Sequence, residues 1–159
     1  AIWAGDDFGG QNGMLISPTM WRELFKPRHA ELFQEIKAAN PEVMIIYHTD
    51  GAVAPIIDDL IEIGVDVLNP VQPNVPGMSP QELKSKFGDR LSFYRAIDQQ
   101  QLLTEGTPEE ISADVASKIE ILGAGGGYMC SSGVIIQEDV SMENVEALIS
   151  AVKKHGVYS

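Results

Sequence analysis

The chain has 159 residues, of which 44% are hydrophobic, and its mean hydropathy is -0.03, so we expect one globular domain over residues 1–159. It has one cysteine, which excludes an internal disulfide framework. Its formal net charge of -12 argues against broad contact with nucleic acid or an anionic membrane, because both require a basic face. No apolar run approaches the roughly 20 residues of a membrane span and no segment resembles a signal peptide, so we expect a cytoplasmic protein.

Short apolar runs alternate with amphipathic stretches along the whole chain. The first strand is predicted at residues 1–7, and a long helix follows it over residues 17–40. Within that helix Pro18 suits the first turn, whereas Pro27 predicts a kink or a division into two helices. A second strand is predicted over residues 43–51, with the sequence VMIIYHTDG.

The helix after the second strand is predicted over residues 53–64, and Gly64 stands where a left-handed cap would end it. Thr107 and Glu110 have the spacing of a capping box at the start of a later helix. The other predicted elements keep the same alternating order, with strands at 65–73, 91–98 and 126–133 and helices at 79–88, 107–123 and 141–156.

Five strands, each followed by a helix, predict a right-handed α/β arrangement in which all strands are parallel and the helices lie outside the sheet. Five such units are too few for an eight-stranded barrel, so either the sheet is open or three units are missing. An open sheet edge favours pairing with another chain, and we therefore expect self-association.

Polar side chains gather where the predicted strands end. In parallel α/β folds this edge carries the functional sites, because its loops vary without disturbing the packed interior. The residues concerned are Asp6, Asp7, His48, Asp50, Asn69, Gln72, Arg95, Asp98, Cys130 and Ser131.

Several segments, taken in order, resemble a known family. They are GDDFGGQNGMLISPTMWRELFKP, YHTDG, LIEIGVDVLNPVQP, FGDRLSFYRAID, GTPEEI, GGGYMCSSG and ENVEALISAV. Together they resemble the C-terminal half of the uroporphyrinogen decarboxylase family, which includes related corrinoid and coenzyme M methyltransferases. The resemblance implies that the chain forms the C-terminal five βα units of a (β/α)8 TIM barrel whose first three units are absent.

The decarboxylase branch of this family implies a carboxy-lyase of tetrapyrrole metabolism that removes carboxylate groups from porphyrinogen acetate side chains without a metal or other cofactor. Ring protonation would form a cationic intermediate that accepts the electrons left as carbon dioxide departs, and aspartates would stabilise its charge. The catalytic candidates are Asp6, Asp7, His48 and Asp50. The candidates for substrate binding are Gln11, Asn69, Gln72, Arg95 and Asp98.

The methyltransferase branch implies a different activity, methyl transfer between a corrinoid protein and a small acceptor. In that branch zinc is held by a His-x-Cys pair and by a cysteine in the last strand loop. Here His48 keeps the histidine, Asp50 replaces the first cysteine and Val134 the second. Under this alternative zinc and a corrinoid are the cofactors, and His48, Asp50 and Cys130 are the metal candidates. A third alternative is a tetrapyrrole-binding or corrinoid-binding fragment without catalytic activity. In each case the resemblance implies a small-molecule partner, a tetrapyrrole or corrinoid ligand.

His48 and Asp50 lie two residues apart on a strand, so both side chains are expected on one face. They would serve as a metal pair or as an acid-base pair, or Asp50 would instead cap the following helix. At most one of Asp6 and Asp7 is expected to point into a site, and both would otherwise cap turns. Arg95 would bind a substrate carboxylate or form an internal ion pair with an aspartate.

The remaining chemically distinctive residues are interpreted as structural. Cys130 is expected to be a small core residue. His29 and His155 are expected on solvated helix surfaces, and Trp3 and Trp21 are interpreted as packing residues rather than cofactor contacts.

Overall fold

The computed structural model describes residues 1–133 and 135–157, so Val134 lies outside the described residues. The strands are β1 (Ile2–Gly5), β2 (Ile45–His48), β3 (Val67–Asn69), β4 (Ser92–Tyr94) and β5 (Tyr128–Met129). The helices are α1 (Pro18–Leu24), α2 (Lys26–Ala39), the 3-10 helix η1 (Ala54–Ile56), α3 (Ile57–Glu62), α4 (Pro80–Phe87), α5 (Leu102–Glu105), α6 (Pro108–Leu122) and α7 (Met142–His155).

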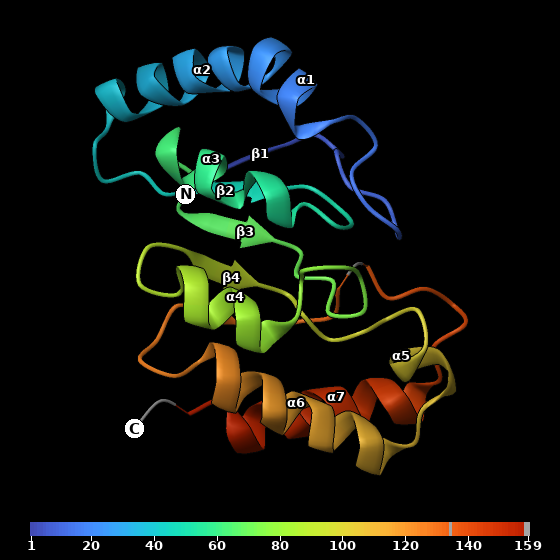
Figure 1. Ribbon diagram of the computed structural model, residues 1–159. Helices are drawn as coiled ribbons and strands as arrows, with labels where there is room; N and C mark the ends of the chain where they lie inside the picture. Colours follow the sequence, from blue (N-terminus) through green and yellow to red (C-terminus); the bar gives the residue numbers. More distant parts are fainter. Residues whose placement is uncertain (134, 158–159) are drawn as a thin grey trace.

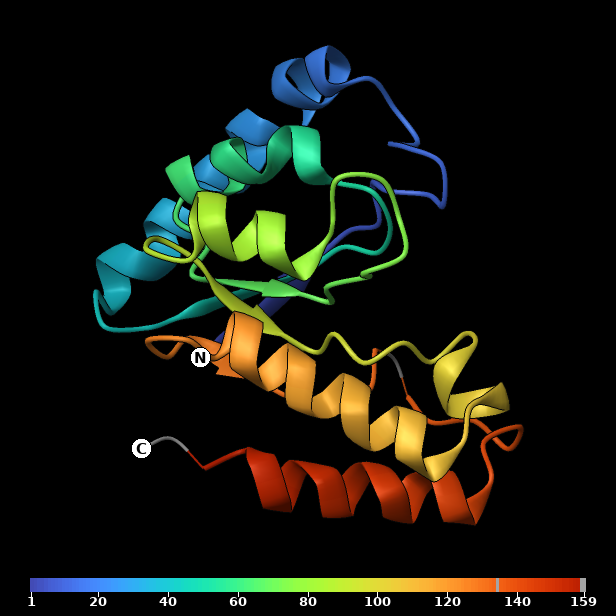
Figure 2. The same ribbon diagram turned by 60° about the horizontal axis from the view of Figure 1, so that its bottom comes forward.

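The five strands form one sheet in the order β1-β2-β3-β4-β5, and all four pairings are parallel. The helices lie along the outer side of this sheet (Figures 1 and 2). Right-handed βα crossovers place successive strands side by side and their helices on one face. The predicted α/β arrangement of five parallel units is therefore confirmed.

Local sequence signals set the helix boundaries as predicted. The division at Pro27 is real, because α1 ends at Leu24 and α2 starts at Lys26. Thr107 and Glu110 form the predicted reciprocal capping box of α6, and Gly64 has the left-handed φ of +99°. The short helix α5 has no counterpart among the predicted elements.

The hydrophobic core lies between the sheet and the outer helices. Its largest fully buried side chains come from the helix-facing sides of the strands and from the helices packed against them, and they include Tyr47, Leu68, Phe93, Trp21 and Phe33. The opposite side of the sheet has no such cover among the described residues. We call it the open face and define it by Trp3, Met44, Ile46, Tyr94 and Met129.

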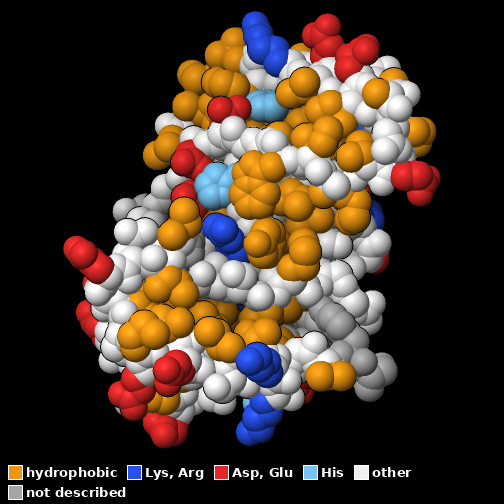
Figure 3. Space-filling model, turned by 180° about the vertical axis from the view of Figure 1, so that it is seen from behind, with side chains coloured by type: hydrophobic (Ala, Val, Ile, Leu, Met, Phe, Trp, Pro, Cys, Tyr) orange, Lys and Arg blue, Asp and Glu red, His pale blue; other side chains and the backbone are white. Residues whose placement is uncertain are grey.

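Figure 3 views the molecule from behind, and hydrophobic side chains gather there in the middle of the surface beside a histidine and a basic side chain. Trp3, Met44 and Met129 are 51%, 45% and 42% exposed. An apolar cavity on this face is lined by Met44, Ile46 and Met129 among others. No helix in the described part of the chain is both long and apolar enough to cross a membrane.

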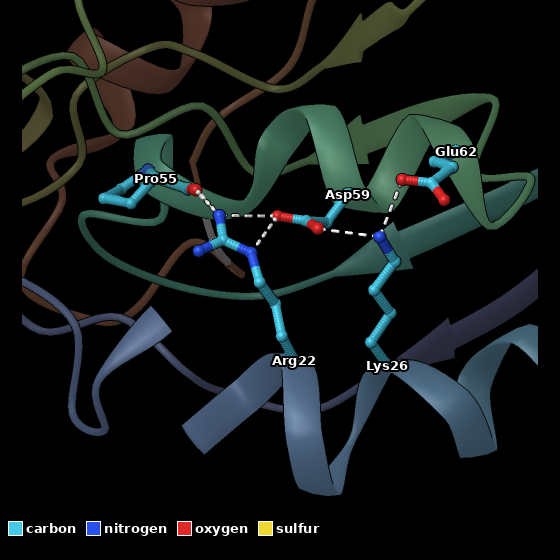
Figure 4. Close-up of polar contacts among 5 residues, drawn as sticks. All are labelled: Arg22, Lys26, Pro55, Asp59 and Glu62. Carbon is cyan, nitrogen blue, oxygen red and sulfur yellow. Dashed lines mark hydrogen bonds and ion pairs between the residues drawn. The ribbon is translucent and has the colours of Figure 1, made fainter. Parts of the chain in front are cut away.

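An ion cluster joins the first βα unit to the second (Figure 4). Asp59 on α3 is buried, and its carboxylate accepts hydrogen bonds from Arg22 Nε at 2.9 Å and from Lys26 Nζ at 2.8 Å. Lys26 also contacts Glu62 at 2.7 Å, and Arg22 Nη2 donates to the Pro55 carbonyl at 3.0 Å. The cluster therefore fixes α1 and α2 against α3.

Candidate active site

Three ionisable side chains meet at the carboxyl ends of β1 and β2. His48 Nε2 lies 3.7 Å from Asp7 Oδ1 and 3.8 Å from Asp50 Oδ2. On the other side of the ring, His48 Nδ1 lies 2.8 Å from Asn69 Oδ1. Because an amide oxygen only accepts, Nδ1 is the donor in this contact, and Nε2 is directed at the two carboxylates. We call Asp7, His48 and Asp50 the acid cluster.

The loops after β1 and β2 hold this cluster through direct backbone contact. Gly51 adopts a φ of +80°, and a Cβ at this position would lie 2.3 Å from the Gly9 carbonyl carbon. The Asp50 amide donates to Asp7 Oδ1 at 3.0 Å, and the Gly51 amide donates to Gln72 Oε1 at 2.6 Å. Each loop is thus hydrogen-bonded to the next, which sets Asp7 beside Asp50.

Two polar atoms of the site are buried without a partner among the described residues, Asp50 Oδ1 and Asn69 Nδ2. Burial raises the pKa of the Asp50 carboxyl; the Asp7 charge adds to the rise, whereas His48 and Arg95 oppose it. Asp50 does not cap the next helix, because η1 follows Val53 without a side-chain cap. An unpartnered carboxylate oxygen in a partly buried site is available to accept a hydrogen bond from a ligand.

Arg95 follows β4 in a left-handed conformation, with a φ of +62°. Its Nη1 donates weakly to the Gly133 carbonyl at 3.4 Å, and its buried Nε has no partner among the described residues. No ion pair joins it to Asp50 or Asp98 within the described part of the chain. Among the described residues, the structure therefore does not contain the alternative, an internal ion pair between Arg95 and an aspartate.

The other predicted substrate-binding residues are not brought together as one group, although Gln72 and Asp98 line the same cavity. Gln72 satisfies the loop backbone at Gly51, and Asn69 orients His48. Asp98 Oδ2 accepts from Asn74 at 2.9 Å in the loop after β4. Gln11 is exposed in the loop after β1. The structure therefore brings Asn69 to the acid cluster, whereas Asp98 and Gln11 have other surroundings.

The set predicted for zinc is not brought together as a group. Among the described residues, the potential ligand atoms that lie within 4.8 Å of one another belong to Asp7, His48 and Asp50, so Asp7 takes the place expected for Cys130. Cys130 is half-buried and packs against the hydrophobic core, as expected for a structural cysteine. Burial raises the pKa of its thiol, which disfavours the thiolate that binds metal.

Asp6 and Asp7 point to different partners, as the alternation along a strand predicts. Asp6 Oδ2 lies 3.1 Å from His29 Nε2 on α2, away from the acid cluster. The expectation that His29 is a solvated surface residue is wrong, because its side chain is 12% exposed and packs against Phe8 and Tyr47. Burial also raises the pKa of Tyr47, whose hydroxyl lies 3.3 Å from His29 Nε2.

The sequence interpretation missed Trp3 as a residue of the site. Trp21 is fully buried as expected, but Trp3 is half-exposed and its ring stacks on that of His48, with centroids 5.9 Å apart. Register explains the contact, since Gly5 pairs with His48 and Trp3 lies two residues earlier on the same face. Alternation along β1 is the signal that identifies Trp3.

Comparison with known proteins agrees with this arrangement. Residues 3–155 match the family described as Uroporphyrinogen decarboxylase (URO-D). A curated uroporphyrinogen decarboxylase from Pseudoalteromonas translucida (strain TAC 125) is 35% identical over 71 residues, which make up 45% of this chain and 20% of that protein.

A solved structure, a methyltransferase from Methanosarcina mazei, superposes with a TM-score of 0.74 at 21% identity, over 98% of this chain and 42% of that one. This likeness shows the fold, and the five parallel units correspond to part of a TIM-barrel-type protein. The chain spans less than half the length of the proteins it matches. From the family match over residues 3–155, the chain belongs to the uroporphyrinogen decarboxylase family.

Proposed function

We propose that the chain supplies one part of the active site of a uroporphyrinogen-decarboxylase-like enzyme, which removes carboxylate groups from porphyrinogen acetate side chains. The observation that carries the proposal is the Asp50 carboxylate, whose Oδ1 is buried without a partner among the described residues next to Asp7 and His48. Family membership and the partial match to a uroporphyrinogen decarboxylase support it.

Each residue of the site has a role suited to this chemistry. Pyrrole N–H groups are donors, and the Asp7 and Asp50 carboxylates are acceptors that would also stabilise a positively charged ring. His48 is held by Asn69 with Nε2 facing the carboxylates, a position from which it would hold a proton for the ring. Arg95, which has no carboxylate partner among the described residues, would bind a substrate carboxylate.

Binding of uroporphyrinogen III to the chain under anaerobic conditions tests the proposal, with product analysis by chromatography as the activity readout. Asp50→Asn removes the negative charge with little change of shape and is expected to weaken binding about 10-fold or more, as for a charged hydrogen bond. Asp58→Asn, on the exposed side of α3, is the matched control and is expected to bind normally. Equal binding by both variants, or none by the unmodified chain, would refute the proposal.

A second candidate function is methyl transfer assisted by a divalent metal. It is favoured by one observation, that Asp7, His48 and Asp50 each place a ligand atom within 4.8 Å of the others. These residues would hold a borderline ion such as zinc through one nitrogen and two oxygens, and the ion would supply activation of an acceptor thiol. Stoichiometric zinc binding that is lost in His48→Ala would favour this candidate, and a chain without zinc affinity would count against it.

A further inference from the structure

A half-exposed aromatic surface adjoins the acid cluster on the open face. Trp3 is 51% exposed, although it stands in a strand and touches two other rings. Its centroid lies 5.9 Å from that of His48 at an interplanar angle of 26°, and 6.1 Å from that of Tyr94 at 86°. The site thus presents an indole ring that neighbouring side chains orient and leave half exposed.

The guanidinium of Arg95 lies against the same aromatic group. Its Cζ atom is 5.9 Å from the Trp3 ring and 5.4 Å from the Tyr94 ring, within the range of cation–π contact. Guanidinium has five N–H donors, yet one weak bond to Gly133 is its hydrogen bond among the described residues. A non-glycine residue at a φ of +62° is strained, and such strain concentrates at ligand sites.

We propose that Trp3 and Arg95 form a subsite for one planar heteroaromatic ring that bears a carboxylate. The ring lies on the exposed face of Trp3, the carboxylate accepts hydrogen bonds from Arg95, and the ring N–H is directed to Asp7 or Asp50. This inference rests on the proposed function, since pyrroles with carboxylate side chains are the units of a tetrapyrrole. The subsite assigns to Trp3 the discrimination between aromatic and saturated ligands, because the indole is a stacking platform for a planar ring.

Pyrrole-2-carboxylate is a probe of this subsite, and two relatives isolate its features. Cyclopentanecarboxylate keeps the charge without the π system, and pyrrole keeps the ring without the charge. Binding is followed through the indole N–H resonances of Trp3 and Trp21, which Trp3→Phe assigns. Pyrrole-2-carboxylate is expected to shift the Trp3 resonance saturably and to leave that of the fully buried Trp21 unchanged.

Variants separate the contributions of the ring and the cation. Trp3→Ala is expected to weaken binding of pyrrole-2-carboxylate about 10-fold, as for loss of one stacking platform, and Trp3→Phe to retain most of the affinity. Arg95→Met is expected to weaken binding about 10-fold as well. Arg90→Met is the matched control, because Arg90 also lies 5.9 Å from an aromatic ring but is paired with Asp58.

Three results would overturn the subsite. The first is equal affinity for cyclopentanecarboxylate and pyrrole-2-carboxylate, and the second is unchanged affinity for pyrrole-2-carboxylate in Trp3→Ala. The third is a Trp3 resonance that shifts with protein concentration but not with ligand, which would make Trp3 a contact between copies of the chain.

The two proposals fail separately. If uroporphyrinogen binding depends on Asp50 but not on Trp3, the subsite is wrong and the proposed function stands. If pyrrole-2-carboxylate binds at Trp3 while no tetrapyrrole binds, the subsite stands and the proposed function is wrong.

Discussion

Replacing Asp59 by asparagine is expected to loosen the attachment of the first βα unit to the second. The carboxylate accepts from Arg22 and Lys26 at 2.8–2.9 Å, and its side chain is 11% exposed (Figure 4). Hydrogen bonds to charged groups contribute about 1.5–3 kcal/mol each, but both cations regain water when the carboxylate is removed, so we expect a loss of roughly 2–3 kcal/mol in the free energy of unfolding.

In a chain of this size such a loss lowers the melting temperature by about 4–12 °C. Urea unfolding followed by circular dichroism measures the free energy, and Glu62→Gln is the matched control. Glu62 lies on the same helix and contacts the same lysine, but its side chain is 71% exposed, so its removal is expected to change stability by less than about 0.5 kcal/mol. An Asp59→Asn variant no less stable than Glu62→Gln would refute the reasoning.

The pH dependence gives an independent check. The hydrogen bonds from Arg22 and Lys26 outweigh the burial of Asp59 and hold the pKa of its carboxyl below its usual range. A lowered folded-state pKa means that the stabilisation is fully present above the unfolded value, about 3.9. It is then lost as pH falls through the lower folded-state value. The stability difference between the unmodified chain and Asp59→Asn should therefore be constant above about pH 4 and shrink below it.

Three further changes test other parts of the structure. Asp50→Asn should raise the melting temperature at pH 7, because burial raises the pKa of the Asp50 carboxyl and its ionisation therefore costs folding free energy. This gain should vanish below about pH 4, where the carboxyl is protonated in both the folded and the unfolded state. A lower melting temperature of the variant at pH 7 would contradict this reasoning. Gly51→Ala should lower the free energy of unfolding by about 2 kcal/mol or more, through a steric clash and backbone strain. Gly125→Ala should lower it by about 1 kcal/mol, because Gly125 has a similar φ but no neighbouring atom that a Cβ would meet. Met129→Lys on the edge strand β5 should weaken self-association in sedimentation experiments, whereas Met142→Lys on α7 should not; equal effects would remove this sheet edge as the contact.

The regular alternation of the chain was sufficient to predict the five parallel units, because apolar periodicity and helix caps are local signals. Pro27 and the capping residues Thr107 and Glu110 act within a few residues of themselves, and their effects were predicted correctly. The proximity of His48, the last residue of β2, to Asp50, two residues later, also follows from local alternation.

Contacts between distant loops were beyond such reasoning. The choice of Asp7 for the acid cluster depends on the approach of Gly9 to Gly51, 42 residues apart in sequence, which no local pattern encodes. His29 is a different case, because Phe25, the N-cap residue of α2, is followed at intervals of four residues by His29 and Phe33, and this spacing places the three on one side of the helix. This aromatic spacing is a signal for burial, and it indicates a buried side chain at His29 although histidine is polar.

The hydrogen bonds that run from loop to loop also bear on how such a site is inherited. Asp7, Asp50 and Gln72 connect three consecutive units, so the acid cluster and its supports are contained within the first 72 residues, whereas Arg95 comes from the fourth unit. Genetic recombination between β3 and β4 would carry the carboxylates and the histidine as one block. Arg95, for which we propose a role in binding the ligand carboxylate, could then be exchanged independently, and substrate preference would diversify around an unchanged acid cluster.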